Sequence, residues 1–247
     1  MTKRILPALL CFALLAQFAG AHPMIKRGPH GKPGSPPSLQ QILDGLVVSG
    51  PPIDASAPSN IELWDNTSGP MTANIVVDNA GPSNSIKFGM YPAGDSGNHV
   101  FLLSGNMSPR DVASVSFNDD GSITINGGHH KPTGSGFDGP FGFFVKIASV
   151  HRQSPVFLFT EADLNGGDVR AEVFQGDGTT TLKFPGQSPG LFLTNQYLIA
   201  FDTNHDGQFN DLIVSVSNIV AVPEPATACL LGFAALAVLS GRRVRIR

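Results

Sequence analysis

The residues with the clearest potential for chemistry lie in one short acidic stretch near the C-terminal end of the chain. Side-chain oxygens occur at alternating positions, in Asp202, Asn204 and Asp206, and a glycine follows directly. Alternate residues of a tight turn point inward and glycine lets the chain reverse, so this spacing reproduces the first half of a Ca²⁺-binding loop. Asp211 could supply a further carboxylate, and the carbonyl of Gln208 another oxygen. The stretch therefore predicts a Ca²⁺ site formed by Asp202, Asn204, Asp206, Gln208 and Asp211.

Two features separate this loop from an EF-hand. An EF-hand carries a glutamate at the twelfth position, where this chain has Ile213, and helices on both sides, where runs 197–201 and 212–216 predict strands. Without the twelfth ligand, we expect a weak Ca²⁺ site with a Kd of about 10⁻⁴ to 10⁻³ M. The alternative is a set of Asx-turns, in which the acids accept hydrogen bonds from backbone N–H groups without metal.

Asp163, Asn165 and Asp168 form a second, weaker oxygen cluster. If the two loops meet at one end of the fold, they could share a cation or hold two. For this cluster alone, the turn interpretation is favoured over a metal site.

Short β-branched and aromatic runs follow one another along the chain and are separated by turn residues such as Asn-Asp-Asp-Gly and Gly-Asp-Gly. This pattern predicts an all-β fold, an antiparallel β-sandwich or jelly-roll-like single domain. The clearest hairpin is 112–126, where apolar residues alternate with Ser and Thr. The many phenylalanines favour a packed core over a ligand platform. The runs span residues 61–64, 74–78, 85–90, 99–103, 113–118, 122–126, 141–148, 156–160, 169–175, 180–184, 196–201 and 212–216.

Composition divides the chain into four parts. Residues 1–21 predict a signal peptide, because Lys3 and Arg4 precede an apolar run that ends in Ala19-Gly20-Ala21. Residues 22–58 are rich in Pro, Gly and Ser and predict an arm or linker, with 39–48 as a short helix or first strand. Residues 59–220 form the predicted β-domain, and 222–247 a membrane segment.

The predicted exported part is strongly acidic. Residues 22–221 hold 10 Lys plus Arg against 18 Asp plus Glu, an excess of about eight negative charges. This surface argues against nucleic acid and anionic lipid head groups as partners, and favours cations. Both cysteines, Cys11 and Cys229, lie in the terminal apolar segments, so no disulfide is expected in the domain.

The C-terminal segment combines Pro223-Glu224-Pro225 with an apolar run from Thr227 to Ser240 and four terminal arginines. A helix from Ala226 to Gly241, about 16 residues, would be about 24 Å long. That is short of the ~30 Å hydrocarbon core, so it would span only with local thinning. The arginines would hold its end in the cytoplasm and leave the domain outside.

This tail resembles the PEP-CTERM sorting signal of exported bacterial proteins, a family defined by the tail alone. The resemblance implies processing by signal peptidase and an exosortase, transient anchoring by the C-terminal helix, and cleavage near Pro223, Glu224 and Pro225. The protein would then be secreted or displayed at the cell surface.

A second resemblance covers residues 141–216. Phe201-Asp202, an acidic turn with glycine, and the run Phe-Asn-Asp-Leu-Ile-Val at 209–214 are similar to the closing motif of an uncharacterised exported β-domain family. Residues 155–168 resemble the strand and Asn/Asp loop that precede it. The chain lacks the family's Phe-Glu-Asp glutamate and has Val169-Arg170 where a histidine often stands. The resemblance implies a β-fold and a calcium site.

Two features of the sequence could belong to an enzyme. Cleavage after Ala21 would make His22 N-terminal, which resembles the copper brace of lytic polysaccharide monooxygenases, but the Pro/Gly-rich residues after it favour a mobile arm. The second imidazole would come from His99, His129, His130 or His151.

Glu161 and Asp163 could be glycosidase carboxylates, yet nothing predicts a cleft lined by Trp64, Tyr91 and Tyr197. The sequence contains no Gly-x-Ser-x-Gly, His-Glu-x-x-His or phosphate loop.

We therefore expect a non-enzymatic structural or extracellular-matrix protein at the cell envelope, in contact with exopolysaccharide. The alternative is a carbohydrate-binding module, which would need an exposed aromatic face or an ion with open coordination positions.

Overall fold

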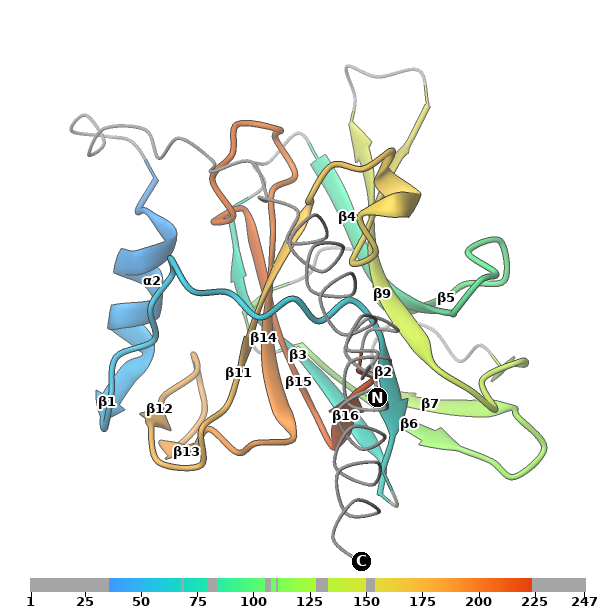
Figure 1. The fold of residues 1–247 in the computed structure, drawn as a ribbon, viewed down its shortest axis with the longest axis horizontal. Helices are drawn as coiled ribbons and strands as arrows, with labels where there is room; N and C mark the ends of the chain where they lie inside the picture. Colours follow the sequence, from blue (N-terminus) through green and yellow to red (C-terminus); the bar gives the residue numbers. More distant parts are fainter. Residues whose placement is uncertain are drawn as a thin grey trace, which may run out of the picture.

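The computed structural model describes residues 36–67, 69–79, 84–104, 108–109, 111–127, 133–149 and 154–223. In this part the chain forms one α-helix, one 3-10 turn and short strands arranged in three antiparallel sheets (Figure 1). The prediction of a β-rich, antiparallel fold is confirmed. Every run predicted to be a strand contains or overlaps one.

Two large sheets form the centre of the molecule. The six-stranded sheet has the order β16 (Ile219–Ala221), β2 (Trp64–Asn66), β9 (Phe141–Ser149), β4 (Asn84–Pro92), β5 (Val100–Leu103), and β10 (Val156–Phe159) pairs with β9. The seven-stranded sheet has the order β11 (Ala171–Gln175), β14 (Gln196–Phe201), β15 (Leu212–Ser217), β3 (Met71–Asp78), β6 (Val112–Phe117), β7 (Ile123–Gly127), β8 (Thr133–Gly134). The predicted hairpin is β6–β7, with Val115 opposite Ile125.

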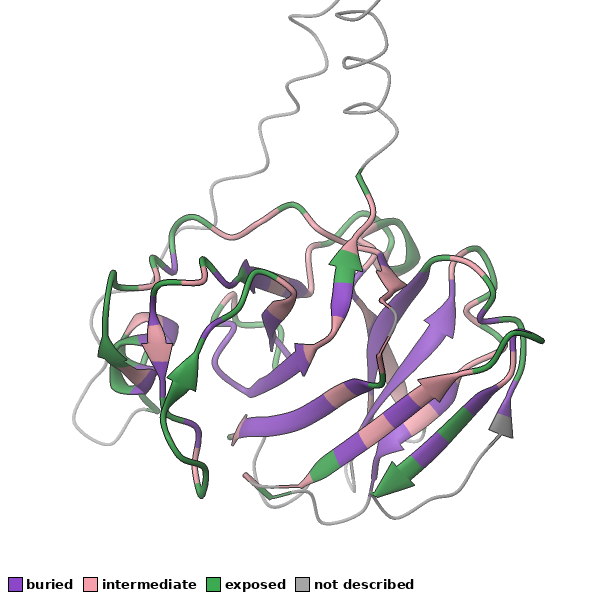
Figure 2. Cartoon of the chain, turned by 90° about the horizontal axis from the view of Figure 1, so that it is seen from below, coloured by how far each residue is buried: buried purple, intermediate pink, exposed green. Residues whose placement is uncertain are grey.

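The main core lies between these two sheets. Side chains at alternate strand positions are buried there, as the two-residue period of a strand requires (Figure 2). Trp64 of the six-stranded sheet lies 5.0 Å from Phe143 and 5.9 Å from Tyr197 of the other sheet, measured between ring centroids. Phe88 stacks on Phe143 at 5.4 Å. Aromatic packing therefore joins the two sheets.

A second core covers the outer face of the seven-stranded sheet. Helix α2 (Leu39–Leu46) and the three-stranded sheet of β1 (Val47–Ser49), β12 (Thr181–Leu182) and β13 (Gly190–Leu191) lie on that side (Figure 1). The helix begins at Ser38 with a capping box to Gln41, and its apolar residues recur every three or four positions. Leu43 packs with Leu198 and Ile213 in this cluster. In its described part, residues 36–58, the predicted arm is thus packed against the sheet. The four-part division of the chain stays a prediction.

The described chain ends just after strand β16, whose Ile219 lies in the main core. Strand β16 pairs with β2, and the N–H of Val222 donates to the carbonyl of Leu63 at 3.0 Å. Pro223 follows directly, whereas Glu224, Pro225 and the predicted signal peptide lie outside the described residues. Helix α2 is too short to cross a bilayer, and no other helix in the described ranges could do so.

We expect Gly89→Ala to destabilise the protein by about 2 kcal/mol. A Cβ at this position would be 2.5 Å from the ring of Phe144 and closer still to the carbonyl oxygen of Val100. The matched control is Gly45→Ala in helix α2, where a Cβ meets nothing within 4 Å. That change should stabilise the protein by about 0.5–1 kcal/mol. Urea midpoints of the two variants compare them directly, and equal midpoints would contradict the close packing at Gly89.

Candidate functional site

The predicted acidic loop, residues 202–211, connects the neighbouring strands β14 and β15. Phe201 pairs with Leu212 at its base. His205 and Gly207 take positive φ angles of 61° and 75°, which allow the chain to reverse. Phe209 is buried in the second core, and the amide of Asn210 donates to the carbonyl of Pro37 at 2.7 Å. The loop is therefore a fixed part of the fold.

Asp211 closes the loop by binding its first residues. The residue is only 4% exposed. Its Oδ2 accepts hydrogen bonds from the N–H of Thr203 at 2.7 Å, the hydroxyl of Thr203 at 3.1 Å and the N–H of Asn204 at 2.9 Å. Oδ1 accepts from the amide of Asn204 at 2.7 Å. Burial raises the pKa of Asp211, against the opposing effect of these hydrogen bonds.

Asp202 holds the middle of the loop in a similar way. Its oxygens accept from the N–H groups of Asp206 at 3.1 Å and Gly207 at 3.0 Å. Asp206 is exposed, and its Oδ1 accepts from the N–H of Gln208 at 2.9 Å. The carboxylates are thus used as acceptors for the backbone of their own loop.

In this structure the five residues of the predicted Ca²⁺ site are arranged as hydrogen-bonded turns. Oδ2 of Asp211 already accepts three donors, and the amide of Asn204 is turned toward Asp211 as a donor. Asn204, Asp206 and Gln208 are exposed. Among the described residues, no group of three His, Cys, Asp or Glu side chains could hold a metal ion. The geometry supports the Asx-turn interpretation, and Ca²⁺ binding at this loop stays a prediction.

The second cluster is also held by hydrogen bonds. Asn165, in the 3-10 turn η1 (Asp163–Asn165), accepts from the N–H of Phe159 at 2.9 Å and donates to its carbonyl at 2.8 Å. The amide thus continues the pairing of β10, with its oxygen turned toward the N–H of Phe159. Asp163 and Asp168 are exposed.

The two loops meet through Arg170, which the oxygen spacing of the sequence does not indicate. Its guanidinium lies 2.7 Å from Asp168 and 3.6 Å from the buried carboxylate of Asp202. The positive charge shared by the two loops in this structure is therefore the guanidinium of Arg170. The position of Arg170 two residues after Asp168 could have suggested their ion pair. Its contact with Asp202 depends on the pairing of β11 with β14, which brings the two loops together.

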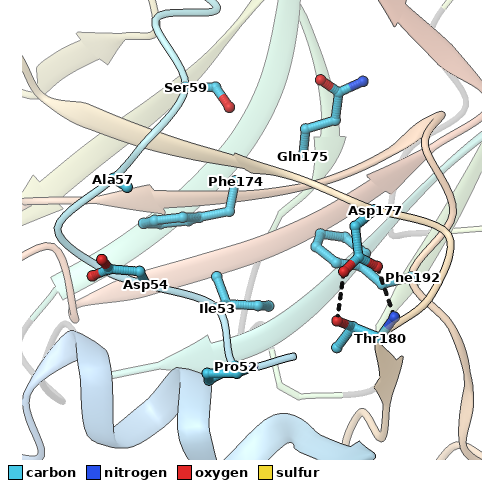
Figure 3. A pocket seen from close by; sticks show the side chains of 10 residues that line it. All are labelled: Pro52, Ile53, Asp54, Ala57, Ser59, Phe174, Gln175, Asp177, Thr180 and Phe192. Atoms are coloured by element: carbon cyan, nitrogen blue, oxygen red, sulfur yellow. Dashed lines mark hydrogen bonds between the residues drawn. The ribbon is translucent and has the colours of Figure 1, made fainter. Parts of the chain in front are cut away.

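A small pocket of about 190 Å³ lies beside the second core (Figure 3). It is lined by residues of the segment after β1, including Ile53 and Asp54, and by Phe174, Asp177 and Phe192. Asp177 accepts hydrogen bonds from the N–H groups of Thr179 and Thr180, each at 2.7 Å. Its carboxylate closes a turn at the rim of the pocket.

These N–H groups lower the pKa of Asp177 below its ordinary value. Because the pKa is lower in the folded state, the stabilisation is present above the unfolded value of about 3.9 and is lost as pH falls. We expect Asp177→Asn to have a lower melting temperature than the wild type at pH 7. The difference between the two melting temperatures should become smaller below about pH 4. Thermal melts from pH 7 to 3 test this, and a constant gap would contradict it.

A larger pocket of about 520 Å³ lies at the ends of β2 and β6. Asn66, Thr67, Phe117, Asp119 and Asp138 contribute to its lining. Neither of these two pockets is lined by Trp or Tyr, on which sugars commonly stack. Trp64, Tyr91 and Tyr197 are all buried.

Of the histidines considered for copper, only His99 lies in the described part. Its Nδ1 is 3.2 Å from the carbonyl of Ser96, and its ring packs against Phe101 and Phe144. His22, His129, His130 and His151 fall outside the described residues.

No protein-family model, no curated protein and no solved structure matches the chain. Conclusions about its function therefore rest on its own residues.

Proposed function

We propose that the chain is an exported, envelope-anchored protein with a structural role in the extracellular matrix and no catalytic activity. A signal peptide would carry a β-sandwich body across the membrane, and the segment 222–247 would anchor it. An exosortase would then cut near Pro223-Glu224-Pro225 and release the body into exopolysaccharide.

The observation that carries this proposal is the position of strand β16 directly before the proposed sorting motif. Strand β16 is paired up to Ala221, and the N–H of Val222 makes the last backbone hydrogen bond among the described residues, to the carbonyl of Leu63. The proposed sorting motif begins at the next residue. A protease acting at the motif would leave both large sheets intact.

The hydrogen bonding of the acids supports the structural role. Asp177, Asp202 and Asp211 each accept hydrogen bonds from at least two groups of nearby loop residues. Such carboxylates stabilise turns, and they account for three of the acids in an acidic domain that lacks cysteine.

Expression in a bacterium that contains an exosortase tests the proposal. We expect the wild-type chain to lose its C-terminal segment and leave the membrane fraction. A triple variant with alanine at Pro223, Glu224 and Pro225 should remain in the membrane at greater mass, while Lys183→Gln should behave as the wild type. Equal processing of the triple variant, or wild-type protein in the cytosol, would contradict the proposal.

A further inference from the structure

Four phenylalanines lie on the outer side of the six-stranded sheet, away from both cores. On β9, Phe143 and Val145 point into the main core. Successive side chains of a strand point to opposite faces, so Phe144 and Lys146 lie on the outer face. The same alternation places Lys87 of β4, Phe101 of β5, and Phe157 and Phe159 of β10 on this side. Together with His99 these residues are called the aromatic face. Helix α2 lies on the opposite side of the molecule (Figure 1).

The rings of this face form one continuous layer. Phe144 is fully buried beneath its neighbours, with centroid distances of 5.4 Å to Phe101, 5.8 Å to Phe157 and 6.2 Å to Phe159. Phe157 and Phe159 are nearly parallel, at 13° and 6.3 Å. The absent side chain of Gly89 leaves the space that the ring of Phe144 occupies. Phe101, Phe157 and Phe159 remain partly exposed.

Two lysines lie over these rings. Nζ of Lys87 is 5.1 Å from the centroid of Phe101, and Nζ of Lys146 is 5.1 Å from that of Phe157. Neither lysine has an ion-pair partner among the described residues. The described ranges contain only four Lys and Arg side chains, and half of them lie here, on a protein with an acidic excess. Contiguous partly exposed rings with unpaired cations are typical of a binding surface.

We propose that the aromatic face binds an acidic polysaccharide, such as a polymer of uronic acids. The C–H groups of a pyranose ring carry a small positive charge and favour the negative face of an aromatic ring, while a uronate carboxylate would pair with Lys87 or Lys146. A second copy of the chain fits less well, because a two-fold interface would place this basic face against itself. This assignment extends the matrix role proposed above, but binding in vitro does not depend on export, so either can fail alone.

Affinity electrophoresis of the full chain in non-ionic detergent tests the proposal, with polygalacturonate as the probe and its fully methyl-esterified form as the neutral control. We expect retardation by the acidic polymer that weakens with salt. The double variant Lys87→Gln, Lys146→Gln should weaken binding at least about tenfold. The matched control Lys183→Gln, an exposed lysine near the second core, should bind as the wild type.

The single variant Phe157→Ala should also weaken the retardation, but the salt dependence of the retardation should stay as in the wild type. The melting temperature of this variant reports whether it folds. Equal binding by the double variant and Lys183→Gln would overturn the proposal. So would retardation by the esterified polymer equal to that by the acidic one. Binding to anionic lipid vesicles in place of the acidic polymer would assign the face to a membrane instead and would equally overturn it.

Discussion

Replacing Phe143 by alanine is expected to lower the free energy of unfolding by about 4 kcal/mol. Phe143 is fully buried and contacts Trp64, Phe88 and Phe141, at centroid distances of 5.0, 5.4 and 5.7 Å. Trp64 and Phe88 in turn contact Tyr197 and Phe201 of the facing sheet. The cavity would therefore open where the two large sheets are joined, and a close-packed site of this kind collapses poorly.

The matched control is Phe157→Ala, on the outer side of the same sheet. Phe157 is partly exposed, so its loss should cost less than about 2 kcal/mol. Urea denaturation of both variants measures the difference. If Phe157→Ala costs as much as Phe143→Ala, the core does not lie between the two sheets as described.

Asp211→Ala is expected to cost about 3 kcal/mol, because it leaves the buried N–H and hydroxyl of Thr203 without their acceptor. Asp206→Ala removes an exposed carboxylate that accepts one backbone hydrogen bond, and should cost about 1 kcal/mol or less. Thermal or urea unfolding of both variants in the presence of a chelator gives these values.

The same pair of variants tests calcium. A Ca²⁺ site saturated a hundredfold above its Kd would add about 2.7 kcal/mol of stability. The hydrogen-bonded loop instead predicts equal melting of the wild type in Ca²⁺ and in chelator. A rise of several degrees in Ca²⁺ that Asp206→Ala abolishes would show that the sequence-based calcium prediction was correct.

Local patterns predicted the strands because each depends on neighbouring residues. The alternation in 112–126 and its Asn-Asp-Asp-Gly turn indicate the β6–β7 hairpin from neighbouring residues alone. Strand β16 was not predicted, since its three residues become a strand only by pairing with β2, which lies far away in the sequence. The packed position of residues 36–58 depends likewise on a sheet face formed later in the chain.

What the acidic side chains of the loops bind was harder to predict from the sequence. Oxygen spacing identified Asp202 and Asp211, but whether their lone pairs meet a cation or backbone N–H groups depends on the path of the loop. The aromatic face was missed because β9 has apolar residues at both odd and even positions, so Phe143 and Phe144 cannot be assigned to opposite faces from sequence. The phenylalanines favoured a packed core, and Phe101, Phe157 and Phe159 lie partly exposed outside both cores.

The most direct test of the export proposal is the mass of the protein isolated from cells that make an exosortase, together with the fraction in which it is found. We expect a chain that begins at His22, ends close to Pro223 and lies outside the cytoplasm. Recovery of the intact 247-residue chain from the cytosol would contradict the proposal.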